Sequence, residues 1–173
     1  MKSRTPATIL LTLLQGILVT GFVAACSSVD CPVENSVLTI YQLQKPDGTP
    51  DTLGIDTLWV RLQRTNGTDT LLVNRLCGTN ATSFKLPVSH SQAEDALHLT
   101  VTDTIGTVWR DTIHVSKQNH AHFESVDCKP AYFHTITAVR SSHHLIDSVH
   151  INKQTVNYDT SDAHILLRLK ARR

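Results

Sequence analysis

The chain has 173 residues, carries 16 basic and 15 acidic side chains, and has a formal net charge of +1 at neutral pH. This length suits one domain with a core of its own. A charge so close to zero does not favour nucleic acid or an anionic membrane as a partner through long-range attraction.

The first 25 residues are typical of a secretory leader. Lys2 and Arg4 precede an apolar run from Ala7 to Ala25, and small residues end this run before Cys26. A basic start, an apolar stretch and small residues at a cleavage site are the parts of a secretory signal. The ending VAAC resembles the lipobox of bacterial lipoproteins, in which the cysteine thiolate receives a diacylglyceryl group. A transmembrane anchor is the alternative, but the far end of the run lacks the flanking charges of a stop-transfer segment.

The leader implies a division of the chain into a signal peptide at residues 1–25, an acylated cysteine with a tether at residues 26–35, and a domain at residues 36–173. Loss of the leader leaves 14 basic against 15 acidic side chains, because two of the 16 basic residues leave with it, and the net charge becomes −1. Two or more acyl chains would hold such a protein at a membrane, since each buried CH₂ contributes about 0.8 kcal/mol.

Three cysteines remain if Cys26 is acylated, in an oxidising compartment where disulfides persist. Cys31 opens the folded part, Cys77 lies in a turn segment rich in Gly, Asn and Ser, and Cys128 lies between two predicted strands. We prefer a disulfide between Cys31 and Cys128, which would tie the start of the chain to the domain, with Cys77 as a spare thiol. The spacing alone leaves Cys77 open as the true partner.

Alternation of apolar and polar residues with period two predicts a series of short strands after Cys31. In the segment TLWVRLQR, for example, Leu58, Val60 and Leu62 share one face. The predicted strands span residues 36–43, 57–64, 69–76, 83–88, 96–103, 107–116, 131–140, 145–152 and 163–170.

Turn-forming residues separate these strands, and Asn66-Gly67 is typical of a hairpin tip. No segment after Cys26 has a helical apolar stripe. The sequence therefore predicts an all-β protein, an antiparallel β-sandwich of immunoglobulin-like type, with a closed β-barrel as the alternative.

The triplet Asp-Thr-aliphatic recurs in the chain and has two interpretations. Structurally, Asp closes a turn, Thr begins a strand and the aliphatic residue enters the core. The triplet also resembles the O-glycosylation acceptor motif of Bacteroidetes envelope proteins, which makes Thr52, Thr57 and Thr70 candidate glycan sites. We favour the structural interpretation, because a strand interior is inaccessible to a transferase.

Histidines are the candidate metal ligands. His120 and His122 would project from one strand face, a suitable pair for zinc or copper, and His143 and His144 could add ligands. Half-exposed histidines on strands need no metal, however, and the spacing matches no diagnostic zinc motif. No catalytic residue is predicted, since the sequence contains no Gly-x-Ser-x-Gly elbow, phosphate-binding loop or Ser-x-x-Lys motif.

The whole mature chain resembles an uncharacterised family of small Bacteroidetes lipoproteins. The likeness rests on Cys26, DCP at residues 30–32, RDTIHV at 110–115, Cys128 with YFH at 132–134, and VRSSHHLIDSVHINKQTVNY at 139–158. The resemblance implies that Cys31 and Cys128 form the disulfide, with Cys77 outside the pattern. It implies no activity. Residues 27–30 lack the acidic run of surface-exported lipoproteins, which favours the periplasmic face of the outer membrane.

These observations predict a non-enzymatic, lipid-anchored envelope protein that binds a partner protein or a glycan, or that has a structural role. The loop at residues 141–147 is the candidate binding surface. The alternative is a metal-binding protein or metal-dependent hydrolase that uses the four histidines.

Overall fold

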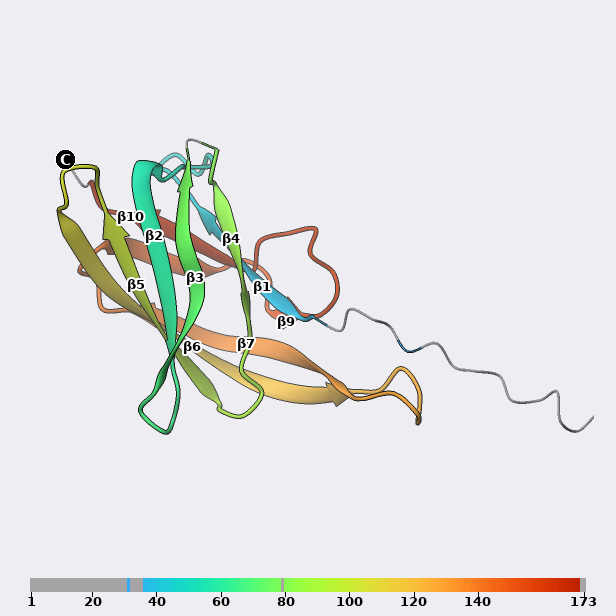
Figure 1. Cartoon of the computed structure of the whole chain (residues 1–173). Coiled ribbons are helices and arrows are strands. Elements are labelled where there is room, and N and C mark those ends of the chain that lie inside the picture. Colours follow the sequence, from blue (N-terminus) through green and yellow to red (C-terminus); the bar gives the residue numbers. More distant parts are fainter. Residues whose placement is uncertain (1–30, 32–35, 79, 172–173) are drawn as a thin grey trace, which may run out of the picture.

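The computed structural model describes residue 31 and residues 36–78 and 80–171 (Figure 1). Within this part of the chain ten strands form and no helix does. The strands are β1 (Leu38–Leu43), β2 (Gly54–Gln63), β3 (Asp69–Gly78), β4 (Ser83–Pro87), β5 (Glu94–Thr102), β6 (Val108–His122), β7 (Ala131–Ser141), β8 (Ile146–Ile151), β9 (Thr155–Val156) and β10 (Ile165–Leu169).

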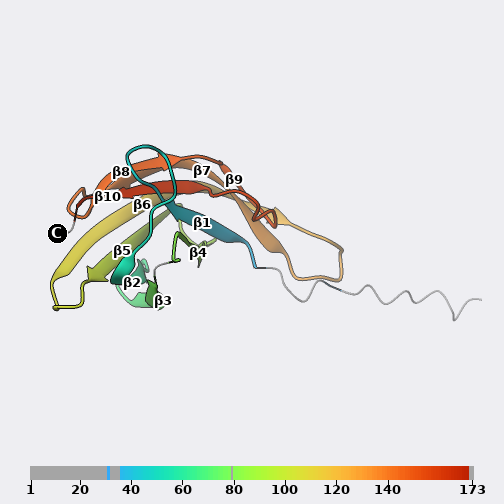
Figure 2. The same ribbon diagram turned by 90° about the horizontal axis from the view of Figure 1, so that it is seen from above.

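The strands form two sheets. One has the order β4-β1-β10-β8 and the other has the order β3-β2-β5-β6-β7-β9. Figure 2 shows the larger sheet curving around the smaller one, so that the two sheets form the layers of a sandwich. All pairs of strands are antiparallel except β1 with β10, which run parallel. The predicted all-β sandwich is confirmed, and the strands do not close into the alternative barrel.

The core lies between the sheets and follows the predicted alternation. Leu58, Val60 and Leu62 of β2 are buried, whereas Trp59 and Arg61 between them face outward. A strand places successive side chains on opposite faces, so an alternating segment buries one row and exposes the other. The side chains with no exposed area are those of Val60, Val101, Ile113, Ile146, Val156, Ile165, Leu167 and His164.

The predicted hairpin tip at Asn66-Gly67 is also confirmed. The amide of Arg64 donates to the carbonyl of Thr68 at 2.9 Å, and the amide of Gly67 donates to the carbonyl of Arg64 at 3.0 Å. Gly67 has a φ of 79°. This left-handed conformation is accessible to glycine without the steric cost that a side chain adds.

Strand β6 is longer than predicted. It continues to His122 and forms a long hairpin with β7, whereas the alternation of apolar residues ends at Ser116. The register shifts between Ser116 and Lys117, and Lys117 then occupies a buried position that an apolar residue would normally fill. The two-residue strand β9 was not predicted, because two residues are too few to show a period.

The signal peptide at residues 1–25, Cys26 and most of the tether lie outside the described residues. Among the described residues, no helix is long and apolar enough to cross a membrane.

Candidate functional site

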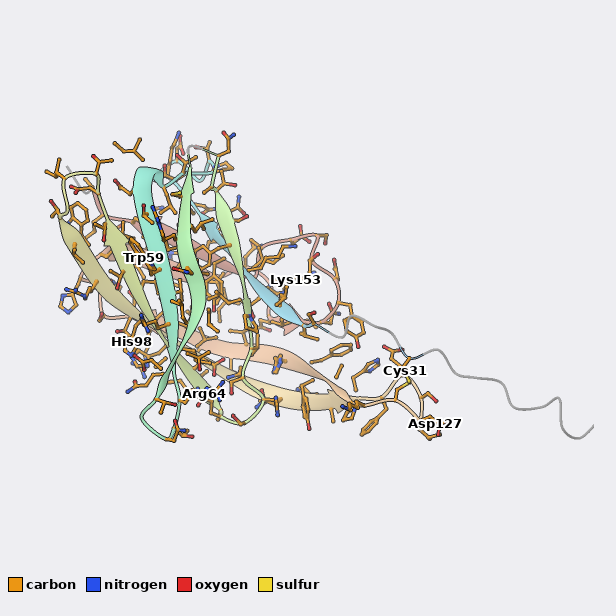
Figure 3. All side chains as sticks on the ribbon, in the orientation of Figure 1. Cys31, Trp59, Arg64, His98, Asp127 and Lys153 are labelled. Atoms are coloured by element: carbon orange, nitrogen blue, oxygen red, sulfur yellow. A yellow bond between two sulfur atoms is a disulfide. The ribbon has the colours of Figure 1, made fainter. Side chains whose placement is uncertain are left out.

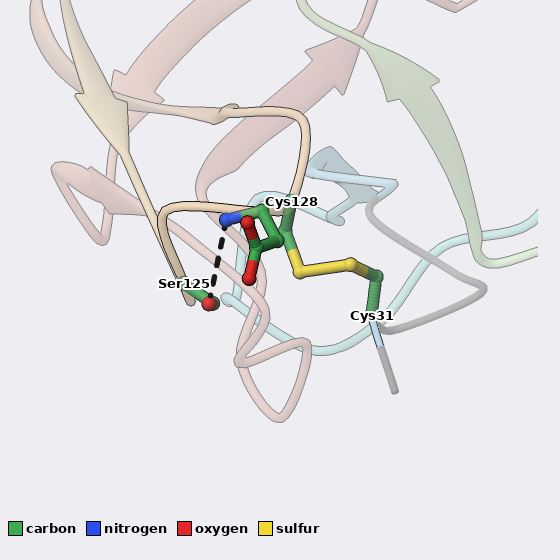
Figure 4. The surroundings of a disulfide bond; sticks show 4 residues. Cys31, Ser125 and Cys128 are labelled. Carbon is green, nitrogen blue, oxygen red and sulfur yellow. Dashed lines mark hydrogen bonds between the residues drawn. A yellow bond between two sulfur atoms is a disulfide. The ribbon is translucent and has the colours of Figure 1, made fainter. Parts of the chain in front are cut away.

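Cys31 and Cys128 form the disulfide, with Cα atoms 5.6 Å apart (Figure 4). Cys128 is buried and lies in the loop between β6 and β7, where its amide donates to the carbonyl of Ser125 at 3.2 Å. Cys77 is a free, exposed thiol in β3. The preferred pairing is therefore confirmed, and the alternative with Cys77 is not formed.

The three candidate glycosylation threonines are all half-buried. Thr57 lies within β2 and is paired on both sides, with Cys77 of β3 and Thr102 of β5. The hydroxyl of Thr70 accepts a hydrogen bond of 2.7 Å from Nε of Arg64. Thr52 lies in the loop before β2. The glycosylation of these residues stays a prediction.

The four candidate metal-binding histidines do not form one site. His120 and His122 lie at the end of β6, opposite Phe133 and Ala131 of β7. His143 and His144 follow the other end of β7, where Ser141 pairs with Ile113. The two pairs are thus separated by most of the β6–β7 ladder, since a strand rises about 3.3 Å per residue.

The histidine rings also have other partners. The ring of His122 stacks on Phe133 with centroids 4.2 Å apart, and its Nε2 lies 3.0 Å from a carboxylate oxygen of Glu124. Nε2 of His120 lies 3.4 Å from the hydroxyl of Thr135. Among the described residues, no group of three or more His, Cys, Asp or Glu side chains could hold a metal ion.

The turn at residues 142–145, between β7 and β8, is held to β6 by the buried carboxylate of Asp111 and by two hydrogen bonds between Thr112 and Ser142. The Ser142 amide donates to the Thr112 carbonyl at 3.0 Å, and the Thr112 amide donates to the Ser142 hydroxyl at 3.1 Å. Oδ1 of Asp111 accepts hydrogen bonds from the amide of Thr112 at 2.7 Å and from the amide and hydroxyl of Ser142 at 3.0 and 2.5 Å. Oδ2 accepts from the amides of Leu145 and Ile146, both at 2.8 Å. Asp111 thus gives the buried amides of Leu145 and Ile146 an acceptor, and a buried amide without one is costly.

Asp111 is ionised in this position. Burial opposes its charge, but the hydrogen bonds from Ser142, Ile146, Leu145 and Thr112 outweigh burial and lower the pKa of the carboxyl group below its usual value. The turn carries His143 in a left-handed conformation with a φ of 58°. The Lys170 ammonium donates to the carbonyl of His143, and the Lys170 amide donates to the carbonyl of Leu145 at 2.9 Å. The turn is therefore fixed from two sides.

A shallow hollow of about 610 Å³ lies beside this turn, on the outer face of the six-stranded sheet. We call it the cationic hollow. Its lining residues come from β2, β5, β6 and the turn after β7, and they are Arg61, His98, Leu99, Thr100, Arg110, Asp111, Thr112, Ser142 and His144.

The positions of these side chains follow from strand alternation and register. His98 and Thr100 alternate with the buried Leu97 and Leu99 and therefore face outward from β5. Arg61 of β2 lies opposite His98, and Arg110 of β6 lies opposite Thr100. The two arginines thus flank β5 from its two sides. Trp59 is the outward residue of β2 that lies opposite Thr100, and Figure 3 labels it with His98.

The charge of the hollow is positive. Arg61 and Arg110 are exposed, and neither forms a salt bridge with any residue that the structure describes. The one carboxylate in the lining is that of Asp111, which already accepts five hydrogen bonds. The donor fork of each guanidinium matches the geometry of a carboxylate or phosphate.

A second polar cluster lies in the interior, at the start of the β6 extension. Nζ of Lys117 lies 2.9 Å from Asp95, and both side chains are almost fully buried. Nδ1 of the buried His134 lies 2.7 Å from Oδ1 of Asn119. Burial and the nearby Lys117 charge lower the pKa of His134 to about 4, so the ring is neutral at pH 7. This cluster gives Lys117 and His134 partners inside the sandwich.

The sequence did not predict the interior cluster, and of the cationic hollow it predicted only the loop that carries Ser142 and His144. The interior cluster has a signal in the sequence, because Asp95 and Lys117 occupy core-facing positions in line with Leu97 and Val115. The arginines of the cationic hollow have no such signal, since Arg61 and Arg110 are close only when β2, β5 and β6 are neighbours.

Comparison with known proteins gives a family. A model described as a family of unknown function (DUF6452) matches residues 57–168, which is more than half of the chain, and the chain belongs to this family. All residues that line the cationic hollow lie within the matched region. No curated protein and no solved structure matches the chain.

Proposed function

We propose that the protein is a non-enzymatic lipoprotein of the bacterial cell envelope that binds an anionic glycan in the cationic hollow. The observation that carries the proposal is the pair of exposed, unpaired arginines on either side of β5. A guanidinium presents a planar fork of donors, and two forks at one hollow suit a carboxylate or phosphate group better than a neutral one.

The surroundings of the arginines favour a sugar chain as the carrier of that anionic group. Thr100, Thr112 and Ser142 place hydroxyls in the lining of the same hollow, where that of Thr112 lies 3.1 Å from Nδ1 of His98 and that of Ser142 donates to Asp111. Trp59 lies opposite Thr100 on the same outward side of the sheet, next to the lining residues, and an aromatic side chain there is suited to stacking against a sugar ring.

The hydrogen bonds of Ser142 support binding rather than catalysis. A serine nucleophile needs a base that accepts its proton. The Ser142 hydroxyl donates to Asp111, but that carboxylate also accepts four other hydrogen bonds, which lower its pKa. Asp111 is therefore a weak base with a structural role.

The location in the envelope is supported by three observations. The leader at residues 1–25 ends in a motif similar to a lipobox, and the chain resembles small Bacteroidetes lipoproteins. The Cys31–Cys128 disulfide suits an oxidising compartment. We propose a lipid anchor on Cys26, on the periplasmic face of the outer membrane.

Calorimetric titration of the full chain, purified in detergent, tests the binding function. Three probes are used: polygalacturonate (an anionic glycan with carboxylates), inorganic phosphate, and dextran (a neutral glycan). We expect heat with polygalacturonate and none with dextran. Heat with phosphate alone would assign the hollow to a small anion rather than a glycan. Binding should weaken as salt rises, because both arginines are exposed.

The double variant Arg61→Ala/Arg110→Ala should lose at least about tenfold in affinity for polygalacturonate, since each charge-assisted hydrogen bond contributes about 1.5–3 kcal/mol. Lys45→Ala/Lys85→Ala removes the same charge from exposed positions away from the hollow and is the matched control. Equal affinity of the two double variants would overturn the proposed site.

A further inference from the structure

The tip of the β6–β7 hairpin, residues 123–130, projects from the sandwich. Strand β6 pairs with β5 as far as Ser116, and its continuation to His122 pairs with β7 alone. Figure 1 shows this hairpin extending beyond the two sheets, and Figure 3 shows Cys31 and Asp127 together at its far end.

Two large apolar side chains of the tip face solvent. Phe123 is 61% exposed and Val126 is 97% exposed, which leaves their side chains free to contact another surface. Ile105 is an apolar side chain of comparable exposure, at 87%, but it lies in the turn between β5 and β6, at the opposite end of β6. The molecule therefore exposes apolar side chains at both ends of this strand, and the disulfide distinguishes one end from the other.

We propose that the hairpin tip contacts the phospholipid surface beside the lipid anchor. This inference rests on the proposed acylation of Cys26. Cys31 lies five positions after Cys26, with four residues between them, and five fully extended steps of the chain span about 17 Å. The disulfide joins Cys31 to the tip. The distance from Cys26 to the tip is thus at most the length of the extended tether, about 17 Å, together with the length of the Cys31–Cys128 link.

The disulfide decides which part of the domain faces the membrane. Without it, the first fixed point would be Leu38 at the start of β1, twelve residues from Cys26 and within a reach of about 40 Å. Such a tether would allow every face of the domain to approach the lipid. The shorter tether keeps the tip at a high effective concentration near the surface, so that weak apolar contacts suffice.

The chemistry of the tip suits a zwitterionic phospholipid surface. Phe123 and Val126 can enter the boundary between headgroups and acyl chains, a depth of about 5–10 Å. Glu124 has its carboxylate 3.0 Å from Nε2 of His122. Asp127 and Lys129 are exposed and of opposite charge, so the tip carries one net negative charge. Anionic lipid should therefore not strengthen the contact.

The proposed orientation has a consequence for the cationic hollow. Thr112 lines the hollow and lies ten residues before His122 on β6, a distance of about 30 Å along a strand. With the tip at the membrane, the hollow lies about 30 Å from the lipid along this strand. The anchored end and the binding end are then opposite ends of one hairpin.

Fluorescence quenching in vesicles tests the contact. The lipidated full chain is reconstituted in phosphatidylcholine vesicles with or without brominated acyl chains, with tryptophan introduced as Val126→Trp or, as the matched control, Ile105→Trp. We expect bromolipid to quench the Val126→Trp signal about twofold relative to the parent, whose Trp59 and Trp109 give the baseline, and to leave Ile105→Trp at that baseline.

A third protein separates the contact from the anchor. Insertion of ten Gly and Ser residues after Asp30 in the Val126→Trp chain leaves the disulfide intact but lengthens the tether. Quenching should fall toward the baseline. Quenching of both tryptophan variants alike, or of neither, in protein that carries its lipid would overturn the orientation and leave the anchor standing. Protein without lipid on Cys26 would overturn the anchor and the orientation together.

Discussion

Replacement of Asp111 by Asn tests whether one carboxylate fixes the turn beside the cationic hollow. The side chains are nearly isosteric, but one oxygen becomes an amide that donates. Leu145 and Ile146, with exposures of 1% and 0%, then compete with Ser142 and Thr112 for the oxygen that remains. A buried donor left unpaired costs about 1–3 kcal/mol, so the loss should be about 2–4 kcal/mol.

Urea unfolding of the purified protein measures this loss. Asp147→Asn is the matched control, because it lies in the same segment but is about half exposed and lies 3.7 Å from Arg168. It should cost less than about 1 kcal/mol. Hydrogen exchange should also quicken at the Leu145 and Ile146 amides in Asp111→Asn alone. A free energy of unfolding for Asp111→Asn within about 0.5 kcal/mol of that for Asp147→Asn would refute the structural role of Asp111.

Two further predictions concern the disulfide and the interior cluster. Removal of the bond with Cys31→Ser/Cys128→Ser should lower the free energy of unfolding by about 2–4 kcal/mol, because the link spans 97 residues, whereas Cys77→Ser should leave it unchanged. Equal stability of Cys31→Ser/Cys128→Ser and Cys77→Ser in urea would contradict a stabilising role of the disulfide. The pKa of His134 is lowered to about 4, so stability is full above the unfolded value near 6.5 and is lost as pH falls toward 4. As the pH falls from 7.5 to 5, the free energy of unfolding of the unsubstituted protein should drop by about 2 kcal/mol more than that of His134→Gln. A difference near zero in urea titrations would rule out this linkage.

The sequence predicted the strands well because burial of one face imposes a period of two. That signal failed where polar residues occupy the inner face. Lys117 and Asn119 continue β6 toward His122, but they interact with Asp95 and His134 instead of packing as apolar side chains, so the strand appeared to end at Ser116.

The candidate site was predicted only in part. The loop at residues 141–147 was chosen for its two histidines, and the structure places His144 and Ser142 of this loop in the lining of the hollow. Arg61 and Arg110 could not be assigned to it from the sequence, because neither lies near the loop along the chain. Their proximity depends on the strand order β2-β5-β6, which short-range patterns do not encode.

Mass spectrometry of the mature N-terminus tests the lipid anchor on Cys26. The protein is extracted from membranes of its native host, and its N-terminal peptide is sequenced. We expect a chain that begins at Cys26 with a diacylglyceryl group on its sulfur. An intact leader, or an unmodified Cys26 in those membranes, would contradict the envelope anchor and with it the orientation of the hairpin tip.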